Sequence, residues 1–314
     1  MPYDYDPELA AGLPMMPTLL LDDVVTMRQA TLELEAKMED FIDRTGVSTR
    51  EVRVPTTHAG EHELVLRVHT PEDQTEPLPL VYDMHGGGFC IGSASFSDAR
   101  AVQMVRDVPA VVVSIDYRLA PEHPYPVPLE DSYHGLVWAG EHADELGIDA
   151  SRIAVYGHSA GGNLAAALCL LARDRGGPHI DFQYLGIPTV DDRGDTASRT
   201  TYEDTAVLDR KNTALAWQHY LGDIHGSDDV PAYAAPIRAE ALAGLPPAYV
   251  SVMQFDPVRD EGIAYATKLA QAGVPTELHL FPATFHGSSM LPMARVSRRE
   301  YAEEAAVLRR ALHG

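Results

Sequence analysis

The sequence contains little cysteine: only Cys90 and Cys169 occur in 314 residues. Two cysteines cannot form the disulfide framework of a small secreted domain, although a single bridge between them is left open. Cysteine generally packs as a small apolar residue, so both side chains are predicted to be buried. The cysteines and histidines nowhere have the spacing of a zinc site, and therefore no metal is expected.

Positive charge is also scarce. Lysine and arginine number 24 against 46 aspartates and glutamates, which gives a net charge of −22 with histidine neutral. A field of this sign repels phosphate backbones and anionic lipid headgroups. The composition therefore argues against a nucleic-acid partner and against attachment to a membrane through a basic patch.

A basic leader and long apolar runs are missing as well. The first ten residues, MPYDYDPELA, carry acids where a secretory signal carries basic residues. The nearby run Leu19–Leu21 is too short for a signal core or for a membrane span. The expectation is a soluble cytoplasmic protein without stable membrane insertion.

Strand-like and helix-like segments alternate along most of the chain. Residues 110–115 (AVVVSI) are almost continuously β-branched, as in a strand that is buried on both faces. Other predicted strands are 62–69, 78–84, 152–156, 182–187, 248–253 and 277–281, and predicted helices are 129–145, 160–175, 261–272 and the segment from residue 297. This alternation is typical of βαβ units and predicts an α/β fold with a mostly parallel central sheet flanked by helices.

Two segments depart from the alternation. Residues 1–50 favour helices, with Gly46 as a natural stop and one predicted helical face that holds Leu34, Met38, Phe41 and Ile42. Residues 193–225 are polar and helix-prone, and they lie between two predicted strands. We expect both segments to form a cap on a catalytic domain of residues 51–314; surface helices without a function are the alternative.

A candidate nucleophile lies between a strand and a helix. Residues 157–161 read Gly-His-Ser-Ala-Gly, the G-x-S-x-G pattern of a nucleophile elbow. The sharp turn crowds the backbone two residues before and two after the serine, where glycine removes the clash. Ser159 is therefore the predicted nucleophile, and His158 is interpreted as structural. A phosphate-binding loop is the alternative, but neither Gly-Lys-Ser/Thr nor G-x-G-x-x-G occurs here.

Three consecutive glycines follow the predicted strand 78–84. Glycine costs conformational entropy on folding, so the run after His85 needs a structural reason. One reason is a flexible turn. The other is a loop that points backbone N–H groups at an oxyanion, where each donor is worth about 3–4 kcal/mol in the transition state. The predicted donors are Gly87, Gly88 and Ala160, and the predicted supports of the loop are His85 and Gly86.

Five motifs follow one another along the chain: HGGGF at 85–89, DYRLAPEHPYP at 116–126, GHSAGGN at 157–163, DPVRDEG at 256–262 and FHGS at 285–288. In this order they resemble the hormone-sensitive-lipase-like branch of bacterial carboxylesterases, which have the α/β-hydrolase fold. The resemblance covers about residues 50–314. Within it, residues 233–288 particularly resemble the bacterial heroin-esterase type. His158 departs from the family, whose members commonly carry Asp there.

A serine nucleophile needs a histidine base and a carboxylate that orients it. In this fold the order along the chain is serine, acid, histidine. Among the six histidines after Ser159, His286 follows the last predicted strand, at the sheet edge where ligands bind in parallel sheets. Asp256 follows the predicted strand 248–253 and is the predicted acid, a role that the resemblance also implies.

Four other acids follow a predicted strand after Ser159 and are considered for the same role. Asp191 and Asp192 follow the preceding strand and are the rival candidates for the acid. A double acid before Arg193 is, however, more typical of a salt-bridged turn. Asp260 and Glu261 are expected at the start of the next helix, where acids are common.

These residues together predict a serine carboxylesterase that forms an acyl-enzyme and needs no cofactor. The resemblance implies a small-molecule substrate, a short-to-medium acyl ester such as an acetyl ester, and it is compatible with a homodimer. Two alternatives stay open: an amidase with the same triad, and a ligand-binding receptor on this scaffold. Such receptors lack a member of the triad, whereas Ser159, Asp256 and His286 are all present.

Overall fold

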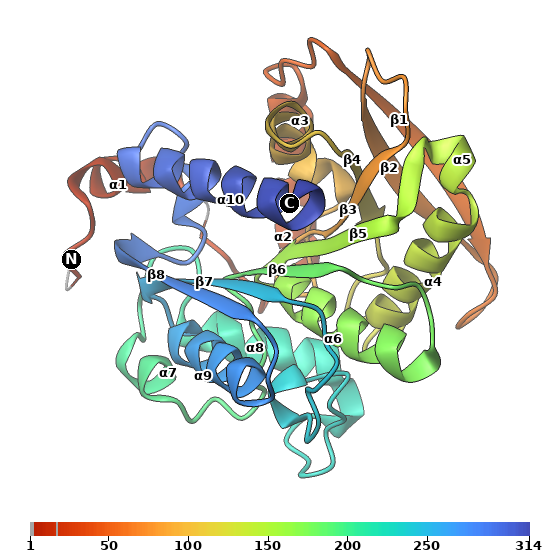
Figure 1. The fold of residues 1–314 in the computed structure, drawn as a ribbon. Coiled ribbons are helices and arrows are strands. Elements are labelled where there is room, and N and C mark those ends of the chain that lie inside the picture. Colours follow the sequence, from red (N-terminus) through yellow and green to blue (C-terminus); the bar gives the residue numbers. More distant parts are fainter. Residues whose placement is uncertain (1–2, 17) are drawn as a thin grey trace.

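The structure is a computed structural model that describes residues 3–16 and 18–314. Within these residues eight strands form one sheet, in the order β1-β2-β4-β3-β5-β6-β7-β8 (Figure 1). The strands are β1 (Val47–Thr56), β2 (His62–Pro71), β3 (Leu78–Met84), β4 (Val111–Asp116), β5 (Ile148–His158), β6 (Phe182–Gly186), β7 (Ala248–Phe255) and β8 (Thr276–Phe285). β2 runs antiparallel to both of its neighbours, and all pairs from β4 to β8 are parallel.

Helices cover both faces of the sheet. The longer ones are α2 (Val24–Glu39), α3 (Asp98–Asp107), α4 (Val127–Glu141), α6 (Ala160–Arg175), α8 (Arg210–Leu221), α9 (Arg259–Gln271) and α10 (Arg295–His313). Short helices are α1 (Pro7–Gly12), α5 (Ala143–Leu146) and α7 (Ala197–Thr201). Figure 1 shows α3 and α10 above the sheet and α6 and α9 below it. The predicted α/β architecture, a mostly parallel sheet flanked by helices, is confirmed.

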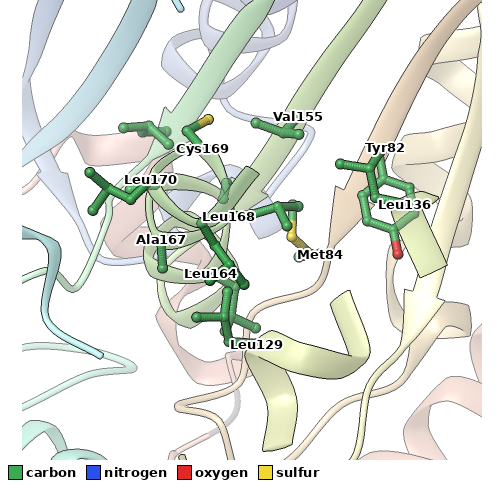
Figure 2. Packing of buried hydrophobic residues seen from close by; sticks show 14 of the residues in the cluster. Tyr82, Met84, Leu129, Leu136, Val155, Leu164, Ala167, Leu168, Cys169 and Leu170 are labelled. Carbon is green, nitrogen blue, oxygen red and sulfur yellow. The ribbon is translucent and has the colours of Figure 1, made fainter. Parts of the chain in front are cut away.

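The main hydrophobic core lies between the sheet and α6. Every residue of α6 from Ala160 to Ala172 is buried, because the helix packs against the sheet on one side and against α4 and the short 3-10 helix Pro236–Arg238 on the others. Figure 2 shows Leu164 and Leu168 of this helix close to Met84 and Val155 from the sheet. Full burial of such side chains contributes about 1.5–3 kcal/mol each. A helix buried on all sides needs a mostly apolar sequence, as this Ala- and Leu-rich helix has. Its buried polar side chain, Asn163, donates to the carbonyls of Thr189 and Ala234.

The N-terminal region differs from the expectation in two ways. Residues 47–50 do not belong to a helical segment but begin β1, an edge strand that pairs with β2 along its whole length. The predicted apolar face of residues 34–42 is also wrong, because α2 ends at Glu39 and three of the side chains lie largely in solvent, at exposed fractions of 42% for Leu34, 50% for Met38 and 80% for Phe41. Only Val24 and Thr31 of α2 are buried. The helix rests on the protein mainly through its first half.

The segment 193–225 is largely helical, as predicted, and contains α7 and α8. The side chain of Trp217 and that of Tyr220, both on α8, are fully buried against Phe89, which follows the glycine run. α8 is thus part of the core over this end of the sheet. No helix among the described residues is long and apolar enough to cross a lipid bilayer.

Truncation of a buried side chain on α10 tests this division into buried and exposed helices. Leu308 is fully buried between α10 and the sheet, so Leu308→Ala should lower the free energy of unfolding by about 2–5 kcal/mol. Leu34→Ala on α2 is the matched control and should cost less than about 1 kcal/mol. Urea denaturation followed by circular dichroism measures both. Equal losses for the two variants would contradict the packing described above.

Candidate active site

Ser159 lies in the sharp turn between β5 and α6. Its backbone has φ = 56° and ψ = −119°, a conformation that non-glycine residues rarely adopt. The turn is held from both sides, since the N–H of Ser159 donates to the carbonyl of Gly186 (2.8 Å) and its own carbonyl accepts from Asn163 (3.0 Å). A strained conformation persists only where its surroundings fix it, and it is common at functional sites.

The glycines of the turn are required by close backbone contacts. A Cβ atom on Gly157 would lie 2.2 Å from the carbonyl oxygen of Gly161, and one on Gly161 would lie 1.8 Å from the carbonyl oxygen of Met84. No side chain fits at either position without moving the backbone. This is the crowding that the G-x-S-x-G spacing predicts, and it brings the start of α6 directly against the end of β3.

The structure brings Ser159, His286 and Asp256 together in a hydrogen-bonded chain. His286 Nε2 lies 2.8 Å from Ser159 Oγ, and His286 Nδ1 lies 2.8 Å from Asp256 Oδ2. The distances fit an imidazole whose Nδ1–H donates to the carboxylate while Nε2 accepts from the serine hydroxyl. Asp256 is fully buried and His286 is 5% exposed, whereas Ser159 is partly accessible.

Asp256 and His286 come from the ends of two neighbouring parallel strands. Asp256 directly follows β7 and His286 directly follows β8, so both side chains lie at the carboxyl edge of the sheet. The second oxygen of Asp256, Oδ1, accepts from the N–H of Val258 (2.9 Å). Both carboxylate oxygens therefore have a donor, which offsets the cost of burying the charge.

The rival acids have other partners. Asp191 pairs with Arg193 (2.6 Å), as the interpretation of a salt-bridged turn requires, and Asp192 pairs with Arg238 (2.7 Å). Asp260 and Glu261 lie in the first turn of α9, as predicted. Glu261 does more than begin a helix: it is fully buried, pairs with Arg199 of α7 and accepts from the N–H of Val190. Only the folded chain brings these partners together.

The glycine run passes next to Ser159. A Cβ atom on Gly86 would lie 3.7 Å from the Cβ of Ser159. Gly87 and Gly88 have φ values of 122° and 59°, in the left-handed region that favours glycine, and Gly87 also has no room for a Cβ beside the carbonyl of Ile91. The N–H groups of Gly87, Gly88 and Ala160 donate to no other described residue. Three unused donors near one hydroxyl can bind an oxyanion.

His85 anchors the run. Its Nδ1 lies 2.7 Å from the carbonyl oxygen of Gly86, the hydroxyl of Tyr117 donates to the His85 carbonyl (2.7 Å), and the two rings stack at 4.2 Å. Burial lowers the pKa of His85 to about 4, so the ring is neutral at ordinary pH and donates from Nδ1. The geometry is that of a rigid support and not of a flexible turn.

The N-terminal segment and α8 cover the glycine run, a contact that sequence reasoning missed. The N–H of Leu21 donates to Asn212 Oδ1 (2.9 Å), and the carbonyl of Leu21 accepts from His219 Nε2 (2.8 Å). The Leu21 side chain is thereby held 3.0 Å from the position that a Cβ on Gly88 would occupy. No sequence signal marks Leu21, because both of its bonds depend on a helix that lies about 190 residues further along the chain.

Sequence reasoning also missed the contacts of Arg28 on α2. Its guanidinium donates to the carbonyls of Cys90 and Ala120 (2.6 Å each) and pairs with Glu122 (2.7 Å). Arg28 thus joins α2 both to the end of the glycine run and to the proline-rich stretch 116–126. Within the residues described, no cluster of three or more His, Cys, Asp or Glu side chains is arranged to hold a metal ion.

Comparisons with known proteins identify the family of the chain. The Abhydrolase_3 family model, described as the alpha/beta hydrolase fold, matches residues 81–290. Carboxylesterase NlhH of Mycobacterium tuberculosis is 38% identical over 314 residues, which cover 99% of this chain and 97% of that protein. An ethyl acetate hydrolase of Pseudomonas putida is 31% identical over 237 residues, 74% of this chain and 73% of that protein.

Solved structures of esterases are also similar to this chain. A bacterial heroin esterase is 46% identical, has a TM-score of 0.95 and matches 99% of both chains. The resemblance predicted from the five motifs is therefore confirmed, including its similarity to the heroin-esterase type. From the family match over most of the chain and the full-length carboxylesterase relative, we conclude that the chain belongs to the Abhydrolase_3 family of α/β hydrolases and is a carboxylic ester hydrolase.

Proposed function

We propose that this ester hydrolase acts through a serine acyl-enzyme, with Ser159 as nucleophile, His286 as general base and acid, and Asp256 as the carboxylate that orients the histidine. The observation that supports the proposal is the unbroken chain of two 2.8 Å contacts from Ser159 Oγ through the imidazole to Asp256. A serine hydroxyl is a weak nucleophile until a base in contact with it removes the proton.

In the first half-reaction, Ser159 Oγ forms a bond to the ester carbonyl carbon while its proton moves to His286 Nε2. The carbonyl electrons move onto the oxygen, which becomes the oxyanion of a tetrahedral intermediate. When this intermediate collapses, the carbon–oxygen bond to the alcohol breaks and the alcohol oxygen takes the proton from His286. The products of this half-reaction are the free alcohol and acyl-Ser159.

In the second half-reaction, water takes the place of the alcohol. The water oxygen attacks the acyl carbon while His286 accepts a proton from the water, and a second oxyanion forms. Its collapse breaks the bond to Ser159 Oγ, which regains the proton from His286, and the carboxylic acid leaves. Asp256 favours the imidazolium that exists in both steps, because a fully buried carboxylate lies 2.8 Å from Nδ1.

The proposed oxyanion donors are the N–H groups of Gly87, Gly88 and Ala160. Ala160 begins α6, so its N–H has no partner within the helix, and the positive end of the helix dipole lies there. Gly87 and Gly88 are supported by His85 and Gly86 on one side and by Leu21 on the other. Each preorganised donor of this kind is worth about 3–4 kcal/mol of transition-state stabilisation.

We infer that the substrates are neutral esters with short-to-medium acyl chains, acetyl esters included. Apolar side chains beside the catalytic histidine support this. Val207 of the segment 193–225 and Met290 lie 3.9 Å and 3.4 Å from the position of a Cβ on Gly287, next to His286. The name of the ethyl acetate hydrolase describes an acetyl ester as the substrate of that relative.

An ester series tests the substrate class. The value of kcat/KM for p-nitrophenyl esters should be highest between acetate and a medium-chain ester. It should fall for palmitate, whose acyl chain is longer than the inferred class. The p-nitroanilide of the best acyl group tests the amidase alternative and should react far more slowly than the ester. A maximum at palmitate, or an anilide that reacts as fast as its ester, would contradict the inferred substrate class.

Substitutions in the hydrogen-bonded chain test the mechanism. Ser159→Ala should lower kcat by about 10⁶, since it removes the attacking oxygen. Asp256→Asn should lower kcat by about 10⁴, because an amide neither stabilises the imidazolium nor selects the required tautomer. Initial rates with p-nitrophenyl acetate measure both.

Two variants serve as matched controls for these substitutions. Ser48→Ala changes an exposed serine on β1, and Asp192→Asn changes the rival acid that pairs with Arg238. Both should retain nearly all of the activity if they fold. Near-full activity of Ser159→Ala would refute the mechanism, and a larger loss in Asp192→Asn than in Asp256→Asn would assign the acid to position 192.

A further inference from the structure

His158, the residue before Ser159, points to the opposite side of the elbow. Successive residues of a strand face opposite sides of the sheet, so His158, the last residue of β5, shares a face with Tyr156. Tyr156 is buried in the cluster between the sheet and the helices α3 and α10. The ring of His158 lies in the same layer, 5.1 Å from the Tyr156 ring, and it packs on Gly186, where a Cβ would lie 2.2 Å from its Cδ2.

The polar partner of His158 is Arg100 of α3. Arg100 Nη2 lies 3.3 Å from His158 Nε2. The rest of the guanidinium binds Glu304 of α10: Nε lies 3.1 Å and 3.2 Å from the two carboxylate oxygens, and Nη2 also contacts the carboxylate. The ring of Tyr301 lies 4.6 Å from the guanidinium carbon. Arg100 therefore connects α3 and α10 to the back of the nucleophile turn.

This contact fixes the protonation state of His158. A guanidinium only donates hydrogen bonds, so Nε2 must accept and cannot carry a proton. Burial, the charge of Arg100 and the charge of His286 all hold the pKa of His158 well below its usual range. The ring is therefore neutral throughout the pH range in which an esterase works. Because electrostatic coupling is mutual, a charge at position 158 would act on His286 in turn.

We propose that His158 is a positioning residue that offers Arg100 a neutral acceptor and so keeps negative charge away from the back of Ser159 and His286. An aspartate at this position would place an anion there. A neutral ring adds no charge that would favour the imidazolium form of His286, so the enzyme remains active further into the acid range than it would with an anion at position 158. The inference rests on the proposed role of His286 as the base.

The other ionisable groups around His158 are either paired or have a raised pKa. Arg100 of α3 is paired with Glu304 of α10, which also accepts from the Tyr156 hydroxyl (2.8 Å). Burial raises the pKa of Glu300 of α10 to about 7 and that of Asp83 of β3 to about 6. Tyr184 of β6, whose pKa burial raises well above its usual range, is neutral.

Glu300 and Asp83 titrate in the same pH range as a catalytic histidine. Both residues are retained in the variants below, and the charge of Glu304 contributes to the raised pKa of each. The decisive comparison is therefore His158→Asp with His158→Asn, because Glu304 is retained in both.

The test is the pH dependence of kcat/KM for a neutral ester, measured from about pH 4.5 to 9. His158→Asp adds a negative charge behind the turn, which favours the imidazolium form of His286 over the neutral base. The acid limb should therefore move to higher pH by about 0.5 units or more. His158→Asn keeps a neutral acceptor for Arg100 and is the matched control, whose acid limb should stay at the wild-type position.

Glu304→Gln provides a second, supporting variant of opposite sign. It removes a negative charge from the same cluster while it keeps the shape and an acceptor for Arg100, so its acid limb should move to lower pH. Circular dichroism shows which variants fold. The proposal is overturned if the folded variants leave the acid limb in place, move it in the reverse direction, or if His158→Asn moves it as far as His158→Asp.

Failure of this inference is distinguishable from failure of the proposed mechanism. A purely structural role for His158 would lower the plateau of kcat/KM without moving the acid limb, and it would leave Ser159→Ala inactive. Retained activity in Ser159→Ala would instead overturn the mechanism itself, whatever the pH profiles of the other variants.

Discussion

The site depends on the close approach of α6 to the end of β3. The backbone of Gly161 comes so near to the carbonyl of Met84 that a Cβ would lie 1.8 Å from its oxygen. Because Met84 ends β3 and is followed by the glycine run, this single contact brings Ser159 and the run into one place. It also forces glycine at position 161 and, through the same turn, at position 157.

Rigid surroundings stabilise the strained backbone of the site. Ser159 is held in a rare backbone conformation, Gly87 and Gly88 adopt positive φ, and three N–H groups stay unused by the described residues. The buried partners around them supply the compensation: the His85–Tyr117 stack beneath the run, Leu21 and α8 above it, and Arg100 behind the turn. A polar group fixed before substrate binds need not reorganise during the reaction, which is the physical basis of oxyanion stabilisation.

Local sequence patterns predicted the parts of the fold that have local causes. The strands before Ser159 and Asp256 are apolar runs, the strand before His286 alternates polar and apolar residues, and the glycine spacings mark the turns that only glycine can make. The failures have long-range causes. β1 is polar and forms because β2 offers a free edge, and α2 exposes Leu34 and Met38 because Arg28 and Val24 hold the helix by its other end. Neither Leu21 nor Arg100 has a local signature, since their partners lie on distant helices.

The central claim is that the acyl group of the ester passes through Ser159. Rapid quenching during turnover of p-nitrophenyl acetate, followed by peptide mass spectrometry, tests it most directly. The account predicts a mass increase of one acetyl group on the peptide that contains Ser159, formed in step with the first equivalent of p-nitrophenol and lost as turnover ends. Steady release of p-nitrophenol with no acylated Ser159 at any time, or acetyl found on another residue, would contradict it.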